Sequence, residues 1–347
     1  MIVRSRAPLR ISLAGGGTDL HAYSDLHGGG VLNAAIDMNA YATITPRRDD
    51  RIVIQAIDRD ERLELEAESK LDVDGTLDLA KGVYNRIVKD YHHGAPLSFE
   101  MQTSVDAPAG SGLGSSSTLV VAMIGAFVRW LQLPLGEYEI ADLACVVERV
   151  DLGFAGGRQD QYAATFGGWN FMEFFPGNRV LVNPLRIRSS HLQELEFNLV
   201  LYYTGTSRLS SSIIERQISN LEAVDGAGGT TQSLDAMHHL KEQAFMMKEA
   251  LLKGELDRIG EILDYGWVHK KNTAAEISNE QIEDIYGAAI RAGASGGKIS
   301  GAGGGGYIIF YCPGNTRYRV IDALRGFGGE IHRMSFDDRG LSTWQIR

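Results

Sequence analysis

The sequence predicts an α+β fold in which mixed and antiparallel sheets pack against helices. Four segments in its first third alternate apolar and polar residues with a period of two, which is typical of antiparallel strands with one solvent-exposed face. Apolar residues recur at helical spacing over residues 79–91 and, in the second half, between residues 234 and 292. A change in composition at residues 183–190 and the length of 347 residues predict two domains, 1–185 and 186–347.

The first half begins with strands. A short β-like segment covers residues 2–6, and residues 7–19 form a strand that ends in a glycine turn. The four alternating segments are residues 31–35, 41–45, 51–57 and 62–67, and one more strand covers 97–103. In the second half we expect strands at 197–203 and 307–312, helices at 234–252, 256–271 and 279–292, and a linker at 224–232.

A loop rich in glycine and hydroxyl side chains spans residues 106–118, directly after the strand at 97–103. Gly110, Gly112 and Gly114 occupy alternate positions, so the backbone can take positive φ and approach a ligand closely. An apolar helix follows, and its first N–H groups and dipole favour a phosphate chain. Ser115 stands where a Walker loop requires lysine, so this is a different phosphate loop. The alternative is a glycine-rich turn that caps a buried helix.

Three other segments carry features of a site. A helix over residues 138–150 has Glu148 near its end, and the glycine-rich turn after it presents a second carboxylate, Asp160. Residues 293–306 form another glycine-rich loop. Each of its glycines costs roughly 0.5–1 kcal/mol of backbone entropy relative to alanine, which indicates that the loop has a function. Its alternative is a flexible connection. Taken singly, Arg10 is best explained as a solvated strand residue and Asp19 as a helix cap.

Composition limits the function further. A formal charge of −10 argues against nucleic acid or an anionic membrane as the main partner. The N-terminus lacks the apolar core of a signal peptide, and Arg129 interrupts the longest apolar helix, so we expect a cytoplasmic protein. Cys145 and Cys312 lie in apolar runs and are expected to be buried thiols.

Residues 7–19, 108–118 and 298–306 resemble, in this order, the three signature motifs of the GHMP small-molecule kinases. The resemblance covers almost the whole chain and implies a two-domain fold with the active site in the cleft between the domains. It also implies ATP and Mg²⁺ as cofactors. The residues that it assigns to the ATP phosphates are Gly110, Ser111, Gly112, Leu113, Gly114, Ser115, Ser116 and Ser117.

The resemblance assigns the remaining roles as well. Ser116 and Glu148 would hold the metal, Asp160 would face the substrate hydroxyl, and Arg10 would lie near the γ-phosphate. An arginine beside Asp160 would stabilise its charged form and favour an orienting role, but the sequence leaves open whether Asp160 removes the proton. The residues expected to contact the substrate are Gly16, Gly17, Thr18, Asp19, Gly157, Gly303 and Gly304.

The first motif separates branches of the family. Galactokinases carry a Glu-His pair where this chain has Gly16 and Gly17, so galactose is disfavoured. The chain more closely resembles the branch with D-glycero-D-manno-heptose 7-phosphate kinases and L-fucokinases. That resemblance implies phosphorylation of the anomeric hydroxyl to a 1,7-bisphosphate, on the way to nucleotide-activated heptose for surface polysaccharide. A sugar phosphate needs a second anion site, for which Arg208, Lys270 and Lys271 are candidates; two adjacent lysines are otherwise usually solvated surface.

Alternatives remain at this stage. In a kinase of L-fucose or another unphosphorylated sugar, the second anion site would be idle. A sensor on the same scaffold would bind sugar and nucleotide without turnover, although it would not need Arg10, Ser116, Glu148 and Asp160 together. A mevalonate-type decarboxylase is disfavoured by the first motif. The expected partners are a small sugar phosphate and ATP, and a homodimer is left open.

Overall fold

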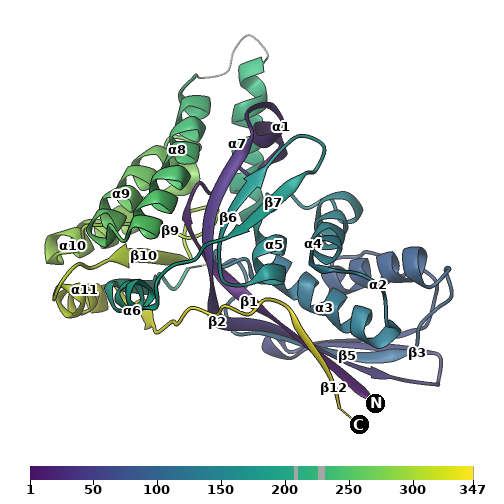
Figure 1. Ribbon diagram of the computed structural model, residues 1–347. Coiled ribbons are helices and arrows are strands. Elements are labelled where there is room, and N and C mark those ends of the chain that lie inside the picture. The colour runs from purple at the N-terminus through teal and green to yellow at the C-terminus, as the bar shows by residue number, and fades with distance from the viewer. Residues whose placement is uncertain (207–209, 226–230, 347) are drawn as a thin grey trace.

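The computed structural model describes residues 1–206, 210–225 and 231–346 and confirms the α+β prediction (Figure 1). Within these residues, eight strands form one sheet in the order β12-β1-β2-β5-β3-β4, and β6 and β7 extend it beside β2. All pairs are antiparallel except β3 with β5. The strands are β1 Ile2–Ala14, β2 Gly29–Pro46, β3 Arg51–Ala56, β4 Glu61–Glu66, β5 Phe99–Val105, β6 Trp169–Phe174, β7 Val180–Pro184 and β12 Ser342–Ile346.

The predicted strands at 31–35 and 41–45 are parts of one long strand, β2. It pairs with β1 along most of its length, with register shifts near Pro8 and Ser12. The predicted alternation is clearest in β4, where exposed and half-buried residues follow each other. Strand β12 brings the C-terminus back to pair with β1, so both chain ends lie side by side at one edge of the molecule (Figure 1).

Helices in the right half of Figure 1 lie above β5 and β3 and cover one face of the first sheet. They bury one core with β1, β2, β3 and β5, in which Phe99 and Phe127 are fully enclosed. The helices of the first half are α1 His21–His27, α2 Asp78–Tyr91, α3 Ser115–Leu131, α4 Glu137–Val146 and α5 Gln159–Phe166, and η2 Val147–Asp151 is a π-helical turn between α4 and α5. Helix α5 is only eight residues long and follows several glycines, and sequence analysis treated its start as part of a turn.

Four strands form the second sheet in the order β11-β8-β10-β9 within the described residues. They are β8 Leu199–Tyr203, β9 Gly296–Ile299, β10 Tyr307–Tyr311 and β11 Glu330–His332. The helices of this half are α6 Ser189–Asn198, α7 Ser210–Asp225, α8 Thr231–Lys253, α9 Ile259–Lys270, α10 Glu280–Ala292 and α11 Arg317–Leu324. Short 3-10 turns are η1 Ile57–Arg59, η3 Leu256–Arg258, η4 Ala275–Ile277 and η5 Arg325–Phe327. The predicted linker at 224–232 lies largely outside the described residues.

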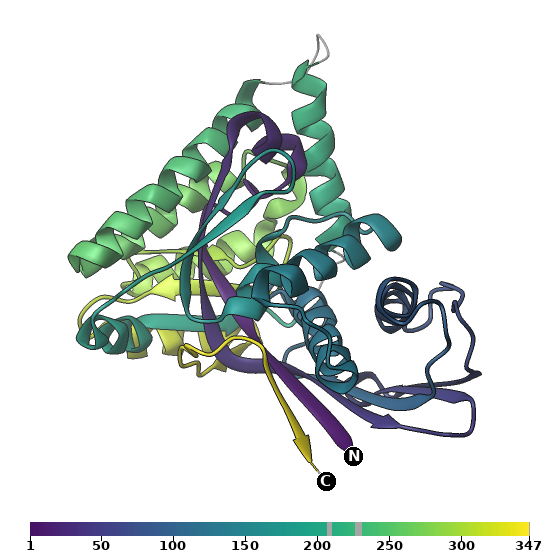
Figure 2. The ribbon, with the colours of Figure 1, turned by 45° about the vertical axis from the view of Figure 1, so that its right-hand side comes forward.

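A shared core joins the two halves. Leu9, Ile11 and Leu13 on β1 pack with Ala244 and Met247 on α8 and with residues of β8 and β10. Figure 2 shows β1 and β2 rising from the first sheet to the helices of the second half. Strand β1 therefore belongs to both halves, and its end at Ala14 places the first glycine turn next to α8 and α9.

The structure also tests the predictions about the cysteines and about membrane-spanning helices. Cys145 and Cys312 are free and buried, as predicted. In the described part of the chain, no helix is both long and apolar enough to cross a membrane.

Candidate active site

The three predicted motifs meet around a cavity of about 570 Å³. Its walls come from the glycine turn after β1, the loop before α3, the start of α5, and parts of α7, α9 and the loop after β9. The predicted residues that line it are Arg10, Gly16, Gly17, Asp19, Gly110, Gly112, Gly114, Ser115, Ser116, Ser117, Glu148, Gly157, Asp160 and Lys270. The fold thus brings together residues from both halves of the sequence.

The loop before α3 has the backbone conformation that its glycines predict. Gly110, Gly112 and Gly114 have φ values of 71°, 84° and 77°. A Cβ atom on Gly112 would lie 2.1 Å from the Ser300 carbonyl oxygen, so only glycine fits there. The Ser300 hydroxyl donates to the Gly112 carbonyl at 2.9 Å. The phosphate-type loop and the glycine-rich loop after β9 therefore support each other.

Helix α3 begins at this loop with its first N–H groups available. Within the described residues no side-chain hydrogen bond caps the helix, because the Thr118 hydroxyl donates back to the Gly114 carbonyl at 2.9 Å instead. The free N–H groups and the helix dipole face the cavity that Ser115, Ser116 and Ser117 line. An anion is the ligand that this end of the helix favours.

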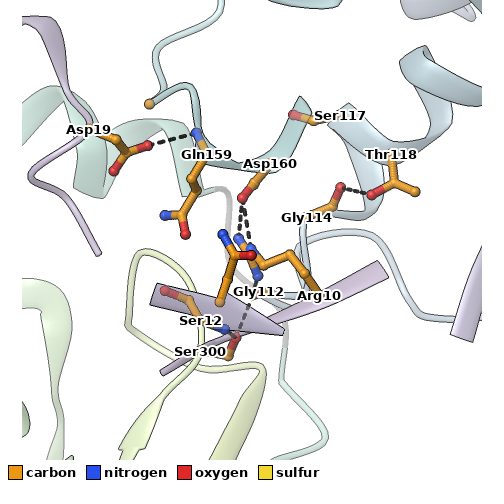
Figure 3. Close-up of polar contacts among 12 residues, drawn as sticks. Arg10, Ser12, Asp19, Gly112, Gly114, Ser117, Thr118, Gln159, Asp160 and Ser300 are labelled. Atoms are coloured by element: carbon orange, nitrogen blue, oxygen red, sulfur yellow. Dashed lines mark hydrogen bonds and ion pairs between the residues drawn. The ribbon is translucent and has the colours of Figure 1, made fainter. Parts of the chain in front are cut away.

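Arg10 and Asp160 form the charged centre of the cavity (Figure 3). The Arg10 Nε and Nη2 atoms lie 2.8 and 2.6 Å from Asp160 Oδ1. Its Nη1 donates to the Gly112 carbonyl at 2.6 Å, and the residue is 2% exposed. The expectation of a solvated strand residue is therefore wrong for Arg10, because the glycine loop and α5 cover this face of β1.

Asp19 holds the start of α5. Its Oδ2 accepts hydrogen bonds from the backbone N–H groups of Arg158 and Gln159 at 2.8 and 3.1 Å. A Cβ atom on Gly157 would lie 1.8 Å from the same oxygen, so glycine is needed for this approach. Asp19 therefore does not cap the helix that follows it, since α1 begins after Leu20 without a side-chain cap; it bonds the start of the distant α5 instead and also lines the cavity.

Glu148 is a buried carboxylate that also lines the cavity. It accepts hydrogen bonds from Ser117 Oγ at 3.0 Å and from the Gln161 amide. Burial raises the pKa of Glu148, so a nearby cation would favour its charged form. The neighbouring Ser116 side chain is exposed to the same cavity. Within the described residues there is no cluster of three or more His, Cys, Asp or Glu that could hold a metal by itself.

Two lysines are buried behind the first glycine turn. Lys270 Nζ donates to the Gly16 carbonyl at 3.0 Å, and burial lowers its pKa to about 8, partly offset by Asp19. Lys298 Nζ donates to the Ser12 carbonyl at 2.7 Å, and burial, Lys270 and Arg10 lower its pKa to about 7. With Arg10, they place three basic side chains around this turn.

Other predicted site residues lie outside the lining of the cavity. These are Thr18, Ser111, Leu113, Lys271, Gly303 and Gly304. The Thr18 hydroxyl bonds the Gly15 and Gly30 carbonyls, and the Gly304 N–H donates to the Ile277 carbonyl, so both groups are used within the fold. Lys271 Nζ pairs with Glu283 at 3.1 Å. Arg208 lies outside the described residues.

Three polar residues at the site were not predicted from the sequence. Gln159 and Arg149 line the cavity, and they directly adjoin Asp160 and Glu148 in the sequence. Arg149 donates from Nε and Nη2 to the Gly157 carbonyl at 3.1 and 3.0 Å and so fixes the turn before α5. Lys298 opens the third motif. The sequence did offer a signal for each of them: Gln159 and Arg149 are next to predicted carboxylates, and Lys298 is part of a predicted motif.

Comparison with known proteins agrees with this geometry. The family model "GHMP kinases N terminal domain" matches residues 78–168, and "GHMP kinases C terminal" matches residues 247–330. The chain is 47% identical over 344 residues to D-glycero-alpha-D-manno-heptose 7-phosphate kinase of Campylobacter jejuni, with 99% of each protein covered. The chain belongs to the GHMP kinase family. The resemblance seen in its three motifs is confirmed.

Two further relatives place this GHMP kinase more closely. A crystal structure described as a D-glycero-D-manno-heptose 1-phosphate kinase from Bacteroides thetaiotaomicron matches with a TM-score of 0.83 and 42% identity, covering 99% of both chains. The L-fucokinase/L-fucose-1-P guanylyltransferase of Bacteroides fragilis is 28% identical over 88% of the GHMP kinase chain, which spans 34% of that longer protein. Members of this family are ATP-dependent phosphotransferases, so the chain is an ATP-dependent kinase.

Proposed function

We propose that this GHMP kinase transfers the γ-phosphate of ATP to the anomeric hydroxyl of D-glycero-α-D-manno-heptose 7-phosphate. The observation that carries the proposal is the Arg10–Asp160 ion pair, which faces the same cavity as the uncapped start of α3. The full-length identity of 47% to a heptose 7-phosphate kinase supports the choice of sugar. The product would be the 1,7-bisphosphate.

The loop of residues 110–117 would bind the ATP phosphates through its backbone N–H groups and the α3 dipole. Glu148 and Ser116 fit a Mg²⁺ ion, because Glu148 offers a buried carboxylate whose raised pKa a cation would offset. Magnesium usually keeps several waters and binds through one or two protein groups plus phosphates, which agrees with so small a donor set. When bound, it would neutralise charge on the transferred phosphoryl group.

Arg10 and Asp160 would act on the acceptor. Asp160 Oδ1 accepts a hydrogen bond from Arg10 Nε and forms an ion pair with Nη2, which leaves its other oxygen for the sugar hydroxyl. The contact with Arg10 fixes the carboxylate in place, so Asp160 would orient the attacking hydroxyl as a hydrogen-bond acceptor. The Arg10 bond to the Gly112 carbonyl holds the guanidinium against the phosphate loop, where transition-state charge develops.

The sugar would lie in the cavity against Asp19, Gly16 and Gly17. Lys270 is our candidate for the substrate's own phosphate, because it is a buried lysine that lines the cavity. An anion beside it would restore the charged form of the lysine. Lys271 and Arg208 stay predictions from the sequence; the ion pair of Lys271 with Glu283 gives Lys270 priority.

The test is ADP release by the purified protein with Mg-ATP and a panel of sugars. The panel is the heptose 7-phosphate, the free heptose, L-fucose, mannose and galactose. We expect turnover with the heptose 7-phosphate and its loss in Asp160→Asn. Preference for a free sugar would move the kinase to the L-fucokinase side of the family, which the 28% relative makes the second candidate. Binding without any turnover would indicate a sensor.

A further inference from the structure

Gln159 lies at the reaction centre but has no role in the mechanism above. It is the first residue of α5, directly before Asp160, and its backbone N–H is held by Asp19. The side chain is 8% exposed and lines the cavity, yet its carbonyl atom Oε1 has no hydrogen-bond partner among the described residues. Figure 3 shows the amide directed between Asp19 and the Arg10–Asp160 pair. A buried acceptor without a partner is costly, which points to a ligand that supplies the donor.

A second buried polar atom lies close by. Ser12 is 1% exposed, and its Oγ also lacks a hydrogen-bond partner within the described residues. A Cβ atom on Gly16 would lie 3.2 Å from Ser12 Oγ and 3.9 Å from Gln159 Nε2. Gly16 is thus close to both side chains, and a Cβ there would crowd Ser12 Oγ. Gly16 and Gln159 both line the cavity.

We infer that Gln159 determines substrate specificity by accepting a hydrogen bond from the sugar hydroxyl on C2. The inference rests on the proposed function, in which Asp160 faces the anomeric hydroxyl. The Gln159 amide lies beside Asp160 in the cavity (Figure 3), so the sugar groups nearest to it would be those next to the anomeric carbon, the ring oxygen and the C2 hydroxyl. The ring oxygen carries no proton and cannot donate to Oε1. The C2 hydroxyl can, and it would satisfy the unpaired acceptor.

A purely structural role for Gln159 makes a different prediction. If the amide only positioned α5, its removal would lower turnover of every sugar by the same factor. A residue that pairs with the C2 hydroxyl instead changes the ratio between a sugar and its 2-deoxy counterpart. Sites that hydrogen-bond a hydroxyl reject analogues that lack it, because their own buried groups are then left unpaired.

The experiment measures kcat/KM for D-glycero-D-manno-heptose 7-phosphate and its 2-deoxy counterpart in the wild type, Gln159→Met and Gln159→Glu. We expect the wild type to prefer the 2-hydroxy sugar by about 10- to 100-fold. In Gln159→Met the preference should fall towards one with an unchanged KM for ATP, while Gln159→Glu, which keeps an acceptor oxygen, should retain it. Gln193→Met is the matched control, since Gln193 is exposed on α6.

Several outcomes would overturn the inference. One is equal kcat/KM of the wild type for the two sugars. Another is a preference for the 2-hydroxy sugar that is as large in Gln159→Met as in the wild type. If Gln159→Met does not fold, calorimetry measures the affinity of the wild type, with ADP bound, for the heptose 7-phosphate and for its 2-deoxy counterpart. Equal affinity for both sugars would reject the hydrogen bond to Gln159. If the enzyme prefers a free sugar, the same ratio is measured with mannose and its 2-deoxy counterpart. That result would reject the heptose 7-phosphate assignment while still testing Gln159.

Discussion

Arg10 and Asp160 are 150 positions apart in the sequence, and their side chains meet at 2.6 Å in the cavity. Replacing Asp160 with asparagine keeps the size of the side chain but removes its charge. We expect kcat to fall by about 10²- to 10⁴-fold with little change in the KM for ATP. Steady-state kinetics and a thermal melt check this, with Asp322→Asn as an exposed control. A kcat within threefold of the wild type would exclude Asp160 as the residue that faces the acceptor.

Glu148→Gln tests the proposed magnesium site. The amide oxygen can still accept the Ser117 hydrogen bond, whereas the Gln161 amide loses its acceptor, so a thermal melt must accompany the kinetics. Loss of the charge should raise the Mg²⁺ concentration needed for half-maximal activity by about 10- to 100-fold. Titration of activity with Mg²⁺ measures this, and Glu249→Gln on the surface is the control. An unchanged Mg²⁺ requirement in Glu148→Gln would remove Glu148 from the site.

Lys270 and Lys271 offer a matched pair for the substrate phosphate. Lys270 is buried and lines the cavity, whereas Lys271 is paired with Glu283 outside the cavity lining. Lys270→Met should raise the KM for the sugar phosphate by at least about tenfold, since it removes a charge-assisted contact. Lys271→Met should change it by less than threefold, and neither should change the KM for ATP. Equal effects of the two substitutions on the sugar phosphate would contradict the assignment to Lys270.

The buried Lys298 should make the folding stability of the protein depend on pH. Burial lowers its pKa to about 7, whereas an unfolded chain has the ordinary value of 10.5. The unfolded state therefore binds more protons between these pH values, so this lysine adds stability as pH rises. The contribution is complete above pH 10.5 and is lost as pH falls through 7. Thermal melts of the apo protein from pH 6 to 9 should show a steeper rise in the wild type than in Lys298→Met.

The control for this pH profile is Lys89→Met, because Lys89 is exposed on α2. Its melts should follow those of the wild type at each pH. If Lys298→Met also follows the wild type, the lysine is not held neutral in the fold. The difference between variants isolates Lys298 from other titrating groups such as Lys270.

Gly112 and Gly75 separate steric overlap from backbone conformation. Both have positive φ, but a Cβ on Gly112 would meet the Ser300 carbonyl at 2.1 Å, whereas nothing lies within 4 Å of one on Gly75. Gly75→Ala should cost about 1 kcal/mol of unfolding free energy. Gly112→Ala should cost at least about 3 kcal/mol and weaken ATP binding. Urea unfolding of both variants tests this. Similar losses of unfolding free energy would show that close contact between the phosphate loop and the glycine-rich loop after β9 is not needed for stability.

Local sequence determined the parts of this protein that depend on neighbouring residues. Period-two alternation predicted β3 and β4, and helical spacing predicted α2, α8 and α10. The order of glycine-rich motifs indicated the kinase family and the phosphate loop, because each motif carries its own backbone geometry. Helix α5 was missed since eight residues after a glycine turn carry too short a periodic signal.

Tertiary structure decided everything that depends on contacts between distant segments. Strand alternation by itself indicated a solvated Arg10, and only the family resemblance placed it at the site; its burial against Asp160 comes from the packing of α5 and the phosphate loop on β1. The docking of α9 behind the first glycine turn put Lys270 in the cavity and left its neighbour Lys271 with Glu283. Adjacent residues on a helix point in directions about 100° apart, so charge alone cannot tell them apart. Only the packing of the helix decides which of them meets the substrate.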